Sequence, residues 1–310
     1  MNIAFRIDIS SEIGTGHLTR MSALADAFAQ MGHAYEIFKG EDEPIDYSGF
    51  DIIILDSYLL NDGYITKLNA SNRALVCYDD NALYTYDCDI VLNSNLYASE
   101  LDFKFSGKTP KMLLGGKYAL LRKEFRDSHP IAINKKATRL FVCFGGSDTR
   151  NMTPQVIKAL QDITGVELSV VLGDYTSNDD EVHAAKGANV IIHKSPSSMV
   201  EVMSKCDIAV ASSGSMTYEL AALGIPALTI SQAENQFLIS EYMTRNELSK
   251  SLGNWKNVDF DYVKNETIAL LADYERRKDE SKRLSEAVDK NGAVNAALSI
   301  LSITERKGLK

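Results

Sequence analysis

The stretch that decides the fold runs from the apolar segment Ile3-Ala4-Phe5-Arg6-Ile7, through a polar turn, to Ile13-Gly14-Thr15-Gly16-His17-Leu18-Thr19-Arg20. Beyond it, apolar residues recur at i, i+3, i+4 and i+7 over residues 21–28, which is typical of a helix packed on a sheet. We interpret the stretch as a buried strand, a glycine-containing loop and the start of a helix. His17 lies where unpaired N–H groups and the positive end of the helix dipole meet. The segment fits either an active-site loop or an ordinary turn between strand and helix.

The alternation of strand and helix continues along the chain, which at 310 residues is long enough for two domains. A polar stretch at 126–138, which contains proline, is interpreted as the linker. We predict an α/β fold of two doubly wound, Rossmann-like domains, 1–130 and 137–310, with a central cleft beyond the carboxyl ends of the strands. The C-terminal helices are expected to pack back on the first domain. The expected strands are 3–7, 34–38, 51–55, 73–78, 89–92, 111–114, 140–144, 168–172, 189–193, 208–211 and 227–230. The expected helices are one with the apolar stripe at 21–28 that Gly32 closes, 62–69, 153–160, 180–185, 197–205, 215–223 closed by Gly224, one opening near 235, and the tail 259–302 with a break near 291–292.

Composition narrows the classes of partner. The formal charge of -9 disfavours nucleic acid or an anionic membrane surface, because either would require a basic face. No apolar run approaches the ~20 residues that span a bilayer, and the N-terminus has no basic segment typical of a signal peptide. The four cysteines are widely scattered, so we expect buried reduced thiols and a cytoplasmic location. No cluster has metal-ligand spacing, so neither a metal nor a cofactor is predicted.

Two further loops carry residues suited to an anionic ligand. Gly145-Gly146-Ser147-Asp148 follows a predicted strand and offers backbone N–H groups to phosphate, although it lacks the ending of an ATPase P-loop. Residues 211–219 form a small-residue turn that opens a helix, the geometry that holds a diphosphate. Glu219 could bind ribose hydroxyls or simply complement the helix dipole. Asn235-Gln236 could contact a sugar or phosphate or simply begin a helix. The His17 loop lacks the third glycine of a dinucleotide site.

Several motifs together resemble a known family. They are Arg6-x-Asp8, Gly14-Thr15-Gly16-His17-x-x-Arg20, Asp56-Ser57-Tyr58, Lys117-Tyr118-Ala119-Leu120-Leu121-Arg122, Gly145-Gly146-Ser147-Asp148, Tyr218-Glu219-Leu220 and Glu234-Asn235-Gln236. In this order, over nearly the whole chain, they resemble the pseudaminic-acid-pathway UDP-sugar hydrolases and their spore-coat-polysaccharide relatives. One departure is Ser213-Gly214-Ser215-Met216, where many members of the family carry Gly-Gly-Ser-Thr.

The resemblance implies a glycosyltransferase-B (GT-B) fold with a sugar and catalytic-base domain followed by a UDP-binding domain. It implies metal-independent hydrolysis of UDP-2,4-diacetamido-2,4,6-trideoxy-beta-L-altropyranose to free sugar and UDP, by attack of water on the anomeric carbon. Such a reaction belongs to pseudaminic acid biosynthesis, which serves flagellin glycosylation and surface polysaccharide. The alternatives are a GT-B glycosyltransferase with a UDP-sugar donor and a non-catalytic nucleotide-sugar-binding protein.

The resemblance also assigns residues to roles. His17 would be the general base, and the helix N-terminus at which it lies favours the neutral ring. Asp8 and Asp80 fit either substrate contacts or turn formers, and His193, at the end of a strand, could contact uracil. The residues expected to bind the substrate are Gly14, Gly16, Arg20, Asp8, Tyr58, Asp80, Asn235 and Gln236. The residues expected to bind UDP are Gly145, Gly146, Ser147, His193, Ser213, Gly214, Ser215, Met216 and Glu219.

Overall fold

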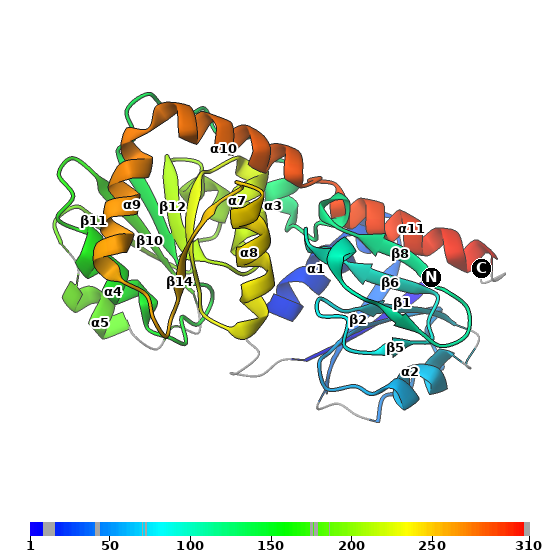
Figure 1. Ribbon diagram of the computed structural model, residues 1–310. Coiled ribbons are helices and arrows are strands. Elements are labelled where there is room, and N and C mark those ends of the chain that lie inside the picture. The colour runs from blue at the N-terminus through cyan, green and yellow to red at the C-terminus, as the bar shows by residue number, and fades with distance from the viewer. Residues whose placement is uncertain are drawn as a thin grey trace. The chain divides into compact units, whose positions relative to one another are not determined.

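The computed structural model describes residues 1–8, 16–40, 44–69, 71, 73–173, 176, 179–185 and 187–306. The chain forms two compact units (Figure 1). The first unit comprises Met1–Lys123 together with Asp289–Lys310, and the second comprises Glu124–Val288. The chain therefore leaves the first unit after residue 123 and returns to it for its last helix.

The first unit is built on a parallel sheet. Within the described residues this sheet has six strands in the order β2-β1-β3-β4-β6-β8. All five residues of β3 are buried, as expected for a strand that is covered on both faces. The strands are β1 (Asn2–Ile7), β2 (Ala34–Lys39), β3 (Ile52–Asp56), β4 (Ala74–Tyr78), β6 (Ile90–Asn93) and β8 (Lys111–Leu114).

Helices from opposite ends of the chain share one core of this unit. Leu24 and Phe28 of α1 (Gly16–Gln30) are buried in the same apolar cluster as Ala296 and Ile300 of α11 (Gly292–Arg306). A second cluster contains Ile65 of α2 (Asp62–Asn69) and side chains from the opposite face of β3. Full burial of each large apolar side chain contributes roughly 1.5–3 kcal/mol. The two clusters therefore hold the sheet from both faces and fix the carboxyl ends of its strands.

The second unit repeats this plan with its own parallel sheet, in the order β11-β10-β9-β12-β13-β14. One apolar cluster joins this sheet to α4, α5 and α9, whereas α7 and α8 pack against β12, β13 and β14. The strands are β9 (Arg139–Cys143), β10 (Glu167–Leu172), β11 (Val190–Lys194), β12 (Ile208–Ser212), β13 (Ala227–Ser231) and β14 (Lys250–Asn254). The helices are α3 (Lys123–Arg126), which begins at the boundary between the units, α4 (Met152–Leu160), α5 (Asp179–Ala185), α6 (Met199–Met203), α7 (Met216–Leu223), α8 (Phe237–Arg245), α9 (Phe260–Ala272) and α10 (Tyr274–Ala287).

Glycine ends two helices where the sequence predicts a stop. Gly32 follows α1 with φ +83°, and the N–H of His33 donates to the Phe28 carbonyl at 3.1 Å. Gly224 ends α7 with φ +61°. A left-handed residue at this position lets the last carbonyls find donors, and glycine adopts it without strain from a Cβ atom.

The α/β class and the parallel sheets confirm the predicted fold, and each expected strand is present with ends shifted by at most two residues. Three strands were not predicted: β5 (Thr85–Tyr86) and β7 (Lys104–Phe105), which pair with each other, and β14. The helix expected at 197–205 is shorter, and the segment near 235 begins with the 3-10 helix η4 (Glu234–Gln236) before α8. All four cysteines, Cys77, Cys88, Cys143 and Cys206, are described, buried and outside any disulfide, as predicted. Over the described residues, no helix has the length and apolar character needed to cross a membrane.

Candidate active site

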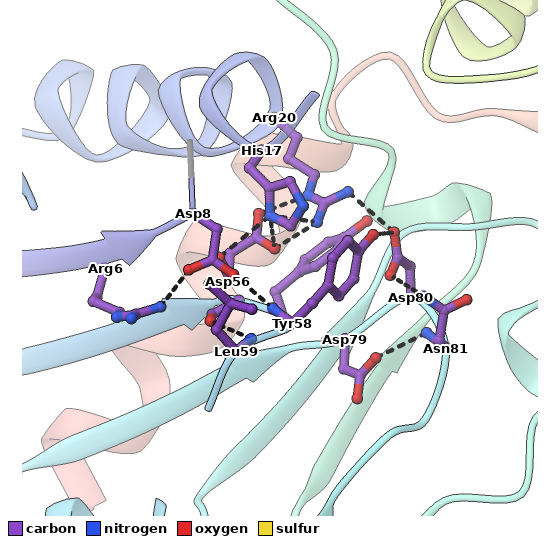
Figure 2. Close-up of polar contacts among 12 residues, drawn as sticks. Arg6, Asp8, His17, Arg20, Asp56, Tyr58, Leu59, Asp79, Asp80 and Asn81 are labelled. Carbon is purple, nitrogen blue, oxygen red and sulfur yellow. Dashed lines mark hydrogen bonds and ion pairs between the residues drawn. The ribbon is translucent and has the colours of Figure 1, made fainter. Parts of the chain in front are cut away.

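Polar residues gather at the carboxyl edge of the sheet in the first unit. Asp8 directly follows β1, Asp56 ends β3, and Asp80 follows β4 by two residues. The strand register brings these ends together, because Ile7 pairs with Asp56 and Asp56 pairs with Tyr78. The first turn of α1 adds His17 and Arg20 to the same edge (Figure 2).

The central contact joins His17 to Asp56. Nδ1 of His17 lies 2.7 Å from Oδ1 of Asp56, and the side chains are 3% and 1% exposed. A carboxylate accepts hydrogen bonds, so this contact assigns the proton of the neutral ring to Nδ1 and leaves the lone pair on Nε2. Tyr58 packs against the ring edge-on, with centroids 4.7 Å apart. The imidazole is therefore fixed in position and in tautomer.

Arg20 binds the same carboxylate as His17. Its Nε donates to Oδ2 of Asp56 at 2.6 Å and its Nη2 to Oδ1 at 2.5 Å, a bidentate arrangement. Nη2 also lies 3.1 Å from Nδ1 of His17, but a protonated Nδ1 has no lone pair to accept from it, so this contact is not a hydrogen bond. Nη1 donates to Oδ2 of Asp80 at 3.1 Å. Asp56 is consequently shared between a guanidinium and an imidazole.

The remaining contacts hold the loops that carry this group. The hydroxyl of Tyr58 donates to Oδ2 of Asp80 at 2.8 Å, and its backbone N–H donates to Oδ2 of Asp8 at 2.8 Å. Arg6 donates to the other oxygen of Asp8 at 2.6 Å. Figure 2 shows these side chains as one connected network. Asp8 therefore accepts a hydrogen bond from the backbone of the loop after β3, while Asp80 accepts from the side chains of Arg20 and Tyr58.

The protonation states in this network follow from burial and from the partners. Burial alone would raise the pKa of Asp56, but the Arg20 guanidinium, with a smaller contribution from His17, holds it below its ordinary value. Burial also opposes the charge of Arg20, yet Asp56, Tyr78 and Asp80 hold its pKa well above the ordinary value. Burial raises the pKa of Tyr78, whose ring lies 4.3 Å from the guanidinium, to about 12. At neutral pH the site holds an aspartate anion, an arginine cation and a neutral tyrosine.

In the second unit, the loop after β9 is held from two sides. Gly145 has φ +83°, and a Cβ on Gly173 would lie only 2.4 Å from the Cα of Gly146, so the two backbones are in close contact. Asp148 accepts hydrogen bonds from the N–H groups of Met152 and Thr153, both at 2.9 Å. Asp148 thus caps α4, and the residues left to meet a ligand are Gly145, Gly146 and Ser147.

The loop between β12 and α7 is anchored to the neighbouring strand. The hydroxyl of the fully buried Ser213 accepts from Ser231 at 3.2 Å, and the Gly214 carbonyl accepts the hydroxyl of Thr217 at 2.6 Å. Glu219 lies in the first turn of α7 and is 6% exposed. Nε2 of Gln236 lies 3.2 Å from the place of a Cβ on Gly214. Ser213, Gly214, Glu219 and Gln236 are therefore brought to one edge of the second sheet.

The other predicted site residues have different settings. Ser215 is exposed just before α7, Met216 is buried in its first turn, and Asn235 is exposed on η4. His193 lies on the edge strand β11, with β10 and β9 between it and β12. Its pKa is lowered by partial burial and, to a smaller extent, by the positive charge of Lys205. Gly16 begins α1, and Gly14 is outside the described residues. No described group of three or more His, Cys, Asp and Glu side chains is arranged to hold a metal ion.

Comparison with known proteins gives one family match. The model of DUF354, a family described as a protein of unknown function, matches residues 131–290. Three relatives match over longer stretches of this chain. The uncharacterized protein MJ1062 of Methanocaldococcus jannaschii is 26% identical over 274 residues, 76% of this chain, and the chain spans 57% of that protein. A Campylobacter jejuni protein named UDP-2,4-diacetamido-2,4,6-trideoxy-beta-L-altropyranose hydrolase is 25% identical, covering 76% of this chain and 93% of its own length. The spore coat polysaccharide biosynthesis protein SpsG of Bacillus subtilis is 20% identical over 99% of this chain and 100% of its own length.

Solved structures agree on the fold. Acinetobacter baumannii MurG superposes with a TM-score of 0.65 at 12% identity, covering 97% of this chain and 100% of that one. The spinosyn forosaminyltransferase SpnP gives a TM-score of 0.66 at 11% identity, covering 98% and 99%. The fold is that of the GT-B glycosyltransferases, as the resemblance implied. With about half of its length matched by the family model, this chain belongs to the DUF354 family, and it is similar to a UDP-sugar hydrolase and to a spore-coat polysaccharide biosynthesis protein.

Proposed function

We propose that this chain is a nucleotide-sugar-processing enzyme that hydrolyses UDP-2,4-diacetamido-2,4,6-trideoxy-beta-L-altropyranose to free sugar and UDP. The observation that carries the proposal is the buried contact of 2.7 Å between His17 and Asp56 at the first turn of α1. The name of the Campylobacter relative supports the substrate and the reaction, and the GT-B fold supports a nucleotide-sugar ligand. The free sugar would enter pseudaminic acid biosynthesis.

His17 is the general base of the proposed reaction. With the proton of Nδ1 donated to Asp56, Nε2 of His17 takes a proton from a water molecule. The oxygen of that water attacks the anomeric carbon, and the bond from this carbon to the diphosphate oxygen breaks with its electron pair leaving on UDP. Asp56 stabilises the positive charge that the ring then carries, and water later removes the proton. The sum is UDP-sugar and water giving sugar, UDP and one proton.

Departure of UDP requires stabilisation of negative charge more than it requires an acid. A diphosphate is already anionic near neutral pH, so backbone N–H groups and the dipole at a helix N-terminus can stabilise it. Gly145, Gly146 and the Ser213–Glu219 segment are the groups that we assign to this role, with Glu219 on the ribose. Gln236, beside Gly214, and Asn235 would complete the lining.

The test is release of UDP from the diacetamido sugar nucleotide with no acceptor present. Wild-type protein should release UDP continuously, whereas His17→Asn should lose most turnover, since general-base catalysis is worth ~10²–10⁴-fold. His129→Asn is the control, because His129 is exposed in the polar stretch between residues 126 and 138. Near wild-type release by His17→Asn would exclude His17 as the base.

A glycosyltransferase is the second candidate, and it is favoured by the transferase names among the structural neighbours. The two functions share the UDP-sugar and differ in whether water or an acceptor hydroxyl meets Nε2 of His17. UDP release that depends on an added acceptor supports transfer. Binding of UDP-sugar without turnover under either condition supports a binding protein.

A further inference from the structure

A cation lies at the edge of the second sheet where the nucleotide loops meet. Arg150 follows the Gly145–Asp148 loop by two residues and places its guanidinium carbon 4.8 Å from the ring centre of Trp255. Its Nε donates to the carbonyl of Gln232 at 3.3 Å. Among the residues that the structure describes, no carboxylate forms an ion pair with it.

Gln232 connects Arg150 to the two loops that we assign to the nucleotide, Gly145–Asp148 and the Ser213–Glu219 segment. Its side-chain Nε2 donates to the carbonyl of Phe144, immediately before Gly145, at 2.7 Å. Its backbone N–H donates at 2.8 Å to Oε1 of Gln236, the residue that contacts Gly214. Gln232 therefore links Arg150, through its backbone carbonyl, to the Phe144–Asp148 loop through its side chain, and to Gln236 beside Gly214 through its backbone N–H.

The aromatic platform beneath Arg150 restricts its motion. Trp255 stacks on Phe237 with ring centres 5.9 Å apart and planes at 20°. The backbone N–H of Trp255 donates to Ser231 at 3.0 Å, so the platform is part of the β13–β14 edge. Lys256 lies 4.9 Å from the same ring but is also 3.5 Å from Glu234. Of these two cations on Trp255, Lys256 is close to a carboxylate, whereas Arg150 forms no ion pair with a described carboxylate and lies over the ring.

We propose that Arg150 binds the diphosphate of the nucleotide, with Trp255 holding the guanidinium in place. This deepens the proposed function and rests on it for the identity of the nucleotide. A protein with a net charge of -9 gives an anionic ligand no general attraction, so local cations must supply it. A guanidinium offers two parallel N–H donors to phosphate oxygens, and such charge-assisted contacts are stronger than those of backbone N–H groups alone.

Calorimetric titration of the full-length protein with UDP and with uridine tests this assignment. Arg150→Met keeps an unbranched apolar stem on Trp255 and removes the charge, so it should weaken UDP roughly 10- to 100-fold and leave uridine within about twofold. Arg150→Lys should lie between, because it keeps the charge without the planar fork. Arg139→Met is the control, since Arg139 lies at the start of β9 and faces Glu167 at 3.6 Å.

The outcomes are distinct. UDP affinity within about twofold of wild type in Arg150→Met overturns the assignment, as does an equal loss for UDP and uridine or a wild-type protein that does not bind UDP. Arg150-dependent UDP binding by a protein that hydrolyses no UDP-sugar supports this site while contradicting the hydrolase. Far-UV circular dichroism of each variant confirms that the exposed substitution leaves the fold intact.

Discussion

Asp56 is shared by two positively polarised partners, and this sharing defines the site at the scale of single residues. Its Oδ1 accepts from Nδ1 of His17 and from Nη2 of Arg20, while Oδ2 accepts from Nε of Arg20. The anion therefore orients the imidazole, and the guanidinium balances part of its charge. Without the guanidinium, burial would raise the pKa of the Asp56 carboxyl and weaken the acceptor that orients the ring.

The first prediction concerns the tautomer of His17. Asp56→Asn preserves size but offers an amide that can turn its N–H₂ toward Nδ1, which favours the ring form with the proton on Nε2. We expect kcat to fall by ~10²–10⁴-fold, with UDP affinity within about twofold of wild type. Steady-state UDP release and calorimetry measure the two quantities. Asp102→Asn, at an exposed position of the same unit, is the control, and unchanged kcat in Asp56→Asn would refute the pair.

The second prediction concerns Arg20. Without its guanidinium, burial raises the pKa of the Asp56 carboxyl, so the carboxylate that orients His17 is lost at higher pH. The low-pH limb of kcat/KM should therefore move to higher pH in Arg20→Met and much less in Arg20→Lys, which keeps the charge. A pH profile of UDP release measures this shift. A limb that moves to lower pH in Arg20→Met would contradict the charge balance.

The sequence predicted His17 as the general base and Arg20 as a substrate-binding residue, but it did not assign Asp56 to the site. Asp56 lies 39 residues from His17, and only the pairing of β1 with β3 brings the two together. The helix dipole at His17 follows from the local sequence, whereas the neighbouring carboxylate does not. Likewise, Gln232 joins loops that begin at Phe144 and Gly214, and no local pattern signals such a contact.

At the scale of elements, the pattern of apolar residues predicted the buried strands and the helices that pack on a sheet. Buried strands such as β3 and β12 are continuous apolar runs, and α1 has a clear apolar stripe. The edge strand β14, Lys-Ser-Leu-Gly-Asn, has a single buried residue and no alternation that would identify it. The two-residue strands β5 and β7 are too short to carry a period. These elements depend on partners supplied by the tertiary fold.

The third prediction compares the two helices that begin with glycine. A Cβ on Gly292 would lie 2.3 Å from the backbone N of Ala119, whereas one on Gly16 would meet nothing within 4 Å. Gly292→Ala should lower the free energy of unfolding by ~1–3 kcal/mol because α11 must move from its contact. Gly16→Ala should change it by less than ~0.5 kcal/mol.

Urea unfolding followed by far-UV circular dichroism measures both changes. Fluorescence is the poorer probe, because the single tryptophan, Trp255, lies in the second unit and Gly292 in the first. Equal stability of the two variants would show that α11 does not pack closely on residue 119.

At the scale of the whole molecule, each unit has its own sheet and its own apolar clusters. The ionised network belongs to the first unit, where the pKa of Asp56 lies below its ordinary value through Arg20 although burial opposes this. A carboxyl group with a lowered pKa in the folded state stabilises the protein above its unfolded pKa of about 3.9. That contribution to the free energy of unfolding is lost as the pH falls through the pKa that Asp56 has in the folded protein.

The fourth prediction follows from this sign. The free energy of unfolding of the wild type should fall more steeply on acidification below about pH 4 than that of Asp56→Asn. Asp79, whose pKa is raised by burial, has the opposite sign, but it is present in both proteins and cancels in their difference. Urea titrations at a series of pH values measure the two slopes, and parallel slopes would contradict the ion pair.

The proposed reaction is attack of water on the anomeric carbon of a UDP-sugar. Hydrolysis in water enriched in oxygen-18, with mass analysis of the released UDP, tests this most directly. Attack at carbon leaves the original bridging oxygen on UDP, so the account predicts UDP without the label. Labelled UDP would place the attack at phosphorus, and absence of UDP release would contradict the hydrolase itself.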